Sequence, residues 1–158
     1  MARLVNRDSS LEELEDDRWS AGPGGETRLM ATVRELRRRP IGDLTVEDMR
    51  LLIRQDVGLA HLLPRAVEVL RVDPLAEGDM YEGDLLAAVL TRSAEVWGEC
   101  PGLRREVRVI VSELADVPPV LKRDVERFLA LWTADGGRRP RTAGPAVDED
   151  GPARPAGR

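Results

Sequence analysis

Apolar residues recur along most of the chain at the three- and four-residue spacing of one helix face. These stripes cover residues 29–36, 45–53, 59–70, 85–90, 101–114 and 118–132. No segment alternates with period two for long enough to favour a strand; the best candidate, 107–111, fits helical spacing better. The pattern therefore predicts an all-α protein, a compact bundle of about five to seven helices.

Local signals place the ends of these helices. Ser10 with Glu13 and Thr45 with Asp48 have the spacing of a capping box, so we expect helices to start after Ser10 and after Thr45. The other expected boundary residues are Pro40, Gly58, Pro101 and Pro118–Pro119. Pro64 lies inside a stripe and predicts either a kink or a short helix stacked on a longer one.

The first and last stripes each place their apolar residues on one face of a helix. The inward residues are Leu29, Val33 and Leu36 in the first, and Leu121, Val125, Phe128, Leu129 and Trp132 in the last.

The last residues, 136–158, differ in composition from the rest. They are rich in Gly, Pro, Ala and Arg, and have almost no apolar side chain larger than Val147. Such a segment cannot bury enough surface to offset its ordering entropy, so we expect a disordered tail behind a helical domain at 1–135. The tail carries five arginines against three acidic residues, a net charge of about +2. Since the whole chain has a net charge of −5, residues 1–135 have a net charge of −7.

The sequence also indicates the cellular compartment in which the protein works. Residues 1–14 contain no apolar run of signal-peptide length, and no window approaches the roughly 20 apolar residues of a membrane span. Cys100 is the only cysteine, so no intrachain disulfide can form. We expect a cytoplasmic protein.

Catalytic groupings are sparse. His61 is the only histidine, which excludes an ordinary multi-histidine metal site, and its place in an apolar stripe favours a structural role. Cys100 precedes a helix-starting proline and is interpreted as an incidental thiol. The glycines at 22–25 lack the Lys-Ser/Thr of a phosphate-binding loop. The sequence predicts no enzyme and no cofactor.

Arg37–Arg39 is the best argument for nucleic-acid binding, and a helix-turn-helix regulator built on 45–70 is the alternative function. Nearly all basic residues are arginines, since Lys122 is the only lysine. This composition looks like the bias of a GC-rich coding sequence. Cations are also favoured at a helix C-terminus, and the domain is acidic. A structural role for these arginines is therefore preferred.

Two acidic groups stand out, at 11–17 and at 73–84. The second contains no basic residue, and Pro74, Gly78 and Gly83 mark it as a loop. Its spacing does not match a calcium-binding loop, which weakens a metal-dependent hydrolase as a third hypothesis. It could be a solvated loop or a docking surface for a basic partner. The candidate contact residues are Glu77, Asp79, Tyr81, Glu82 and Asp84, with Tyr81 either an interface anchor or packed on the next helix.

Four pieces of the sequence resemble the immunity proteins of contact-dependent growth inhibition (CDI) systems. They are Arg39–Asp48, Ile53–Pro64, Asp73–Leu86 and, more weakly, Leu11–Trp19. The resemblance implies a small helical protein that binds the toxic C-terminal domain of a cognate effector in the cytoplasm. It implies no catalytic residues, and such toxins are often nucleases.

Residues shared by inhibitors of different toxins are more plausibly fold-determining than toxin-contacting. On this scaffold interpretation Gly78 and Gly83 supply unusual backbone angles, and Asp84 caps the helix that begins at Leu85. The sequence leaves both interpretations of 73–84 open and favours the scaffold.

Overall fold

The computed structural model describes residues 6–135 of the 158, and the predicted tail at 136–158 lies outside this part. Within residues 6–135 it contains eight α-helices, one 3₁₀ turn and a single isolated β-bridge, between Ser10 and Pro40. The elements are α1 (Leu11–Glu15), α2 (Arg28–Leu36), η1 (Ile41–Asp43), α3 (Val46–Arg54), α4 (Leu59–Val72), α5 (Asp84–Leu90), α6 (Ala94–Glu99), α7 (Pro101–Ser112) and α8 (Pro119–Asp135). The all-α prediction is confirmed.

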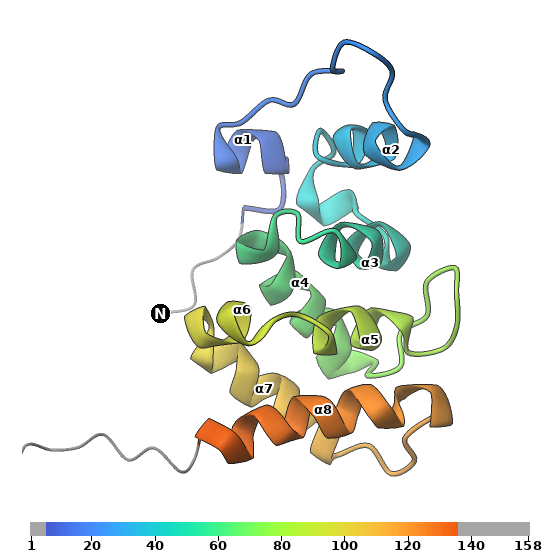
Figure 1. Ribbon diagram of the computed structural model, residues 1–158, viewed down its shortest axis with the longest axis vertical. Coiled ribbons are helices and arrows are strands. Elements are labelled where there is room, and N and C mark those ends of the chain that lie inside the picture. The colour runs from blue at the N-terminus through green and yellow to red at the C-terminus, as the bar shows by residue number, and fades with distance from the viewer. Residues whose placement is uncertain (1–5, 136–158) are drawn as a thin grey trace, which may run out of the picture.

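The helices are stacked along the long axis of the molecule, from α1 and α2 at one end to α7 and α8 at the other (Figure 1). The loop between α4 and α5 projects from one side of this stack. No helix in the described part is both long and apolar enough to cross a membrane.

Both predicted capping boxes are present. The Ser10 hydroxyl accepts a bond from the Glu13 N–H at 3.3 Å, and the Glu13 carboxylate accepts one from the Ser10 N–H at 2.9 Å. Thr45 and Asp48 make the same reciprocal pair at 3.2 and 3.0 Å. Each box satisfies two backbone donors that a helix start leaves without partners, and so starts α1 and α3 where the sequence predicts.

Helix α4 resolves the question that Pro64 raised. Gly58 precedes the helix in a left-handed conformation with φ of 64°, and α4 then runs unbroken from Leu59 to Val72 with Pro64 inside it. The alternative of two stacked helices is therefore wrong.

Helix α5 is the centre of the core. All seven of its residues are buried, and it packs against α3, α4 and α8. A helix that is apolar nearly all round must be enclosed by other elements. Because α5 begins at Asp84, the preceding acidic loop is anchored directly to the most buried part of the molecule.

Helix α6 is the element that the apolar pattern did not predict. It is six residues long, and its buried residue is Trp97, whose ring meets Phe128 of α8 edge-to-face with ring centroids 5.5 Å apart. Such aromatic pairs stabilise a core beyond the area they bury. One large apolar residue in a short segment gives no periodicity, so the apolar pattern could not predict α6. Its contact with α8 is seen only in the folded protein.

The expected inward stripes hold with one exception. Val33 and Leu36 of α2 are buried, but Leu29 is 40% exposed, so its predicted core position is wrong. In α8 the side chains of Leu121, Val125 and Phe128 are buried and Leu129 is partly buried, while the side chain of Trp132 lies outside the described part.

Candidate functional site

The acidic loop between α4 and α5 is folded around the carboxylate of Asp84. This carboxylate accepts bonds from the backbone N–H groups of Gly78 at 2.7 Å, Met80 at 3.0 Å and Tyr81 at 3.4 Å. Asp84 is only 2% exposed. It is the first residue of α5, and the N-cap is Gly83, with no side-chain cap. The prediction that Asp84 caps this helix is therefore wrong, because its carboxylate points back to the loop.

Helix α3 supplies a second carboxylate to the same loop. Glu47 accepts two bonds from the Arg50 guanidinium, at 2.7 and 2.5 Å, and one from the Asp79 N–H at 2.9 Å. Arg50 also lies 3.8 Å from the Asp84 carboxylate. The bond from Arg50 holds the pKa of Glu47 below its ordinary value, against a smaller opposing effect of burial, and the N–H of Asp79 adds to the lowering. Four consecutive backbone N–H groups, 78–81, thus meet two carboxylates.

The two loop glycines are needed for different reasons. Gly83 has φ of 86°, a left-handed conformation that glycine adopts without steric cost, as predicted. Gly78 is not in that region, so the prediction of an unusual backbone angle is wrong there. A Cβ at Gly78 would instead lie 2.5 Å from the Glu47 carboxylate and 3.0 Å from that of Asp84. Gly78 is required because the loop backbone approaches both acids closely.

The outer side of the loop carries the remaining candidate contact residues. Glu77, Asp79 and Glu82 are exposed, whereas Tyr81 is half-buried and packs against the core. Met80 stands among them and is 65% exposed. Met80 could not be identified from the sequence, because a lone methionine is more often a core residue. The inner carboxylates hold the loop, and the outer ones with Met80 face solvent.

The arginines that suggested nucleic-acid binding make contacts with other residues of the same protein. Arg37 is fully buried: it pairs with Glu15 at 3.0 Å, donates to the Asp17 carbonyl at 2.6 Å, and lies over the Trp19 ring, 4.3 Å from its centroid. Its contacts tie the segment after α1 to the end of α2.

The two neighbours of Arg37 also have acidic partners. Arg38 pairs with Glu12 at 3.5 Å, and Arg39 pairs with Glu35 at 3.1 Å. Because Arg37 is buried and its two neighbours are paired with acids, the three arginines do not form a patch of unpaired exposed cations, which weakens the case for a DNA-binding regulator.

The two residues weighed for catalysis lie at the starts of two helices. His61 is half-buried near the start of α4, and Cys100 directly precedes α7. The pKa of the Cys100 thiol is raised by burial and by the neighbouring Glu99 carboxylate, the opposite of what a reactive thiol needs. Among residues 6–135 no group of three or more His, Cys, Asp or Glu side chains is placed to hold a metal ion.

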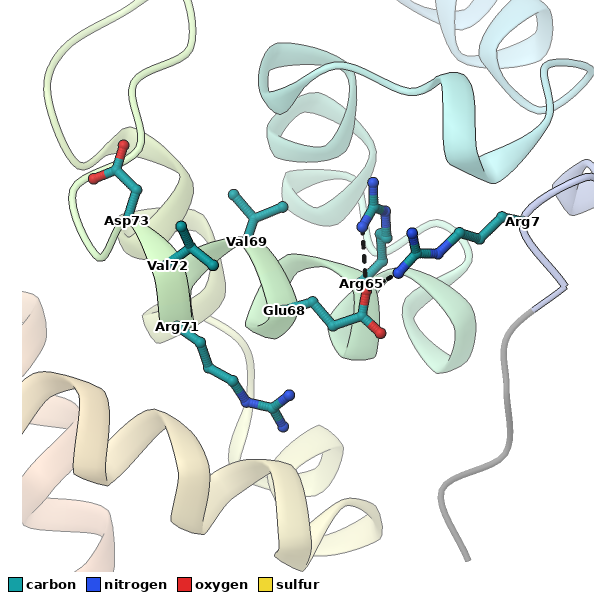
Figure 2. Close-up of a pocket in the computed structure, with 7 residues that line it drawn as sticks. All are labelled: Arg7, Arg65, Glu68, Val69, Arg71, Val72 and Asp73. Carbon is teal, nitrogen blue, oxygen red and sulfur yellow. Dashed lines mark hydrogen bonds and ion pairs between the residues drawn. The ribbon is translucent and has the colours of Figure 1, made fainter.

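A second surface feature, which the sequence did not reveal, lies on α4 and α7. Figure 2 shows an open hollow along α4, lined by side chains that include Arg7, Arg65, Glu68, Arg71 and Val72, with a volume of about 600 Å³. A smaller hollow of about 350 Å³ adjoins it at Arg71 and continues along α7 past Glu106 and Val109. We call the two together the α4–α7 groove.

Comparison with known families decides what kind of protein carries these surfaces. A family model of CDI immunity proteins matches residues 13–107, more than half of the chain. The chain belongs to the CDI immunity proteins. The match confirms the resemblance of the sequence pieces at 11–90, and it spans α2 to α6, the acidic loop and the greater part of the groove. The last helix of this immunity protein, α8, lies outside the match. No curated protein matches the chain.

Proposed function

We propose that this immunity protein works in the cytoplasm by binding the toxic C-terminal domain of a cognate CDI effector in a stoichiometric complex, and that it catalyses no reaction. Family membership supports neutralisation of a toxin. The proposed binding surface is the outer face of the acidic loop. The observation that supports it is that exposed carboxylates surround an exposed methionine there.

The proposed docking residues are Glu77, Asp79, Tyr81 and Glu82 from the sequence, with Met80 added. Like-signed carboxylates attract a basic partner from a distance and raise the association rate, and an apolar side chain at their centre can be desolvated in the complex. Asp84 and the inner bonds contribute by holding the loop in one conformation, which reduces the entropy lost on binding. A net charge of −7 over residues 1–135 favours a basic toxin such as a nuclease, although other basic domains fit equally.

The test is co-expression and co-purification with the C-terminal domain of the large secreted protein encoded beside this chain. We expect a one-to-one complex and rescue of growth. A triple variant Glu77→Lys, Asp79→Lys and Glu82→Lys should raise the Kd by roughly tenfold to a hundredfold, mostly through a slower association rate, with little change in melting temperature.

The matched control reverses three exposed acidic residues elsewhere, Glu95→Lys, Asp116→Lys and Glu126→Lys, and so has the same net charge. A loop variant that binds as tightly as this control would show that the loop is scaffold only. A neighbouring toxin domain that the unaltered protein neither binds nor neutralises would contradict the immunity proposal itself.

A further inference from the structure

The tip of the acidic loop is held by a residue from outside the loop. Asp84 accepts three of the four backbone N–H groups at 78–81, all but that of Asp79. The N–H of Asp79 instead donates to Oε2 of Glu47 in α3 at 2.9 Å, across 32 residues of sequence. Asp79 and the next residue, Met80, are exposed and belong to the proposed docking surface. A contact from α3 therefore fixes the backbone at the point where two proposed docking residues adjoin.

Arg50, one turn further along α3, fixes the carboxylate of Glu47. Its Nε donates to Glu47 Oε2 at 2.7 Å, and its Nη2 donates to Glu47 Oε1 at 2.5 Å. A pair with two parallel bonds defines the orientation of the carboxylate as well as its position. The same Nε lies 3.8 Å from Oδ2 of Asp84. Arg50 thus stands between the two acids that hold the loop, and its side chain is only 12% exposed.

The loop has other attachments that do not depend on Glu47. Asp84 is the first residue of the buried helix α5, and the N–H of Gly83 donates to the Leu75 carbonyl at 3.1 Å, which closes the neck of the loop. Helix α3 itself packs directly on α5. Removing the Glu47 side chain should therefore release the tip around Asp79 and leave the rest of the fold in place.

The Glu47 carboxylate is poorly placed to bind a partner itself. Its two oxygens already accept three hydrogen bonds, out of about four that a carboxylate can accept. Its side chain is 24% exposed, whereas Met80 in the tip that it holds is 65% exposed. This difference favours an indirect role for Glu47, through the loop backbone, over direct contact with a partner.

We propose that Glu47 and Arg50 are positioning residues for toxin binding, which hold the backbone at Asp79 so that the Asp79 carboxylate and the Met80 side chain are presented in one arrangement before the toxin arrives. The inference rests on the proposed function, since the outer face of the acidic loop is the surface that they would position. A tip that is already ordered loses less conformational entropy in the complex. The backbone entropy of a single residue corresponds to roughly fivefold to thirtyfold in Kd.

The test compares the Kd for the C-terminal domain of the neighbouring effector between Glu47→Ala and Glu95→Ala. The control loses the same charge from an exposed position of α6, on the other side of the molecule from the loop (Figure 1). We expect Glu47→Ala to bind roughly fivefold to thirtyfold more weakly than the control. Arg50→Lys leaves the net charge unchanged but loses the two-bond geometry, so it should also weaken binding. In the free protein, amide hydrogen exchange at Asp79 should accelerate in Glu47→Ala and in Arg50→Lys.

A double-mutant cycle separates positioning from a direct or merely structural role. The Glu47→Ala change is repeated in a protein that already carries Asp79→Ala and Met80→Ala. If Glu47 acts through the tip, its effect on Kd should shrink to less than about twofold there, because the side chains that it positions are gone. An undiminished effect would mean that Glu47 contacts the toxin itself or destabilises the protein generally, and would overturn the inference.

Failure of this inference can be told apart from failure of the proposed function. If the unaltered protein binds the toxin, the triple variant at 77, 79 and 82 binds weakly, and Glu47→Ala matches Glu95→Ala, only the positioning inference is overturned. If the unaltered protein does not bind the toxin, both fail. Unchanged hydrogen exchange at Asp79 in Glu47→Ala would overturn the inference without any toxin present.

Discussion

Replacing Asp84 by asparagine should destabilise the protein while leaving its shape and volume almost unchanged. The carboxylate makes two short bonds, from the N–H groups of Gly78 and Met80, and lies near the Arg50 guanidinium. Asparagine retains one carbonyl oxygen, so one of the two short bonds at most persists, and its NH₂ group faces a backbone donor. With the side chain 2% exposed, water cannot replace what is lost.

The expected cost is about 2–4 kcal/mol of unfolding free energy. A hydrogen bond to a charged group contributes about 1.5–3 kcal/mol, and a buried donor left without a partner costs about 1–3 kcal/mol. Breaking a buried charge pair outright costs about 3–5 kcal/mol, and the value here should be smaller because the Arg50–Glu47 pair remains and a buried charge is removed.

The assay is urea unfolding of the unaltered protein, Asp84→Asn and Glu77→Gln. The last variant loses the same charge from an exposed position of the same loop, so it should change the unfolding free energy by less than about 0.5 kcal/mol. Amide hydrogen exchange at Gly78 and Met80 should accelerate in Asp84→Asn alone. If the two variants are equally stable, the loop is not held by the Asp84 carboxylate and the reasoning is refuted.

Three further predictions concern other parts of the fold. Gly78→Ala should destabilise the protein by about 1–3 kcal/mol in urea unfolding, since its Cβ would meet two carboxylates, whereas Gly102→Ala, with nothing within 4 Å, should be neutral or stabilising. Arg37→Ala should cost about 3–5 kcal/mol by removing a buried charge from its partners, while Arg38→Ala on the exposed side should cost less than about 1 kcal/mol; equal costs would contradict this difference. Because the pKa of Glu47 is lowered in the folded protein, the unfolded chain binds the proton first, so this stabilisation is complete above the ordinary pKa of 4.5 and is lost as the pH falls through the lowered value. Unfolding free energy measured against pH should show this loss, and Glu47→Gln should flatten it.

Much of the fold could be predicted because its signals are local. A capping box needs only two residues three apart, and a proline or glycine ends a helix through its own backbone geometry. The starts of α1 and α3 and the break at Gly58 follow from such signals. Helix α6 could not be predicted, since its one buried residue, Trp97, is explained by Phe128, which lies in another helix.

The candidate site could be predicted only as a segment. A run of acidic residues with two glycines and a proline is visible in the sequence, and it indicates a loop. Which acids face inward is not visible, because the partners are distant: Glu47 bonds the Asp79 N–H from 32 residues away. The α4–α7 groove has no local signal, since it exists only where α4, α7 and the N-terminal segment meet.

The sequence by itself thus determined most of the helices, the family and the position of the acidic loop, because each depends on residues that are neighbours in the chain. Tertiary structure alone decided the roles of individual charges. Burial made Asp84 a ligand of the loop backbone and Arg37 a link between α1 and α2, while exposure left Glu77 and Glu82 free to face a partner. A charged side chain acquires its role from the groups that surround it after folding, and those groups come from other helices.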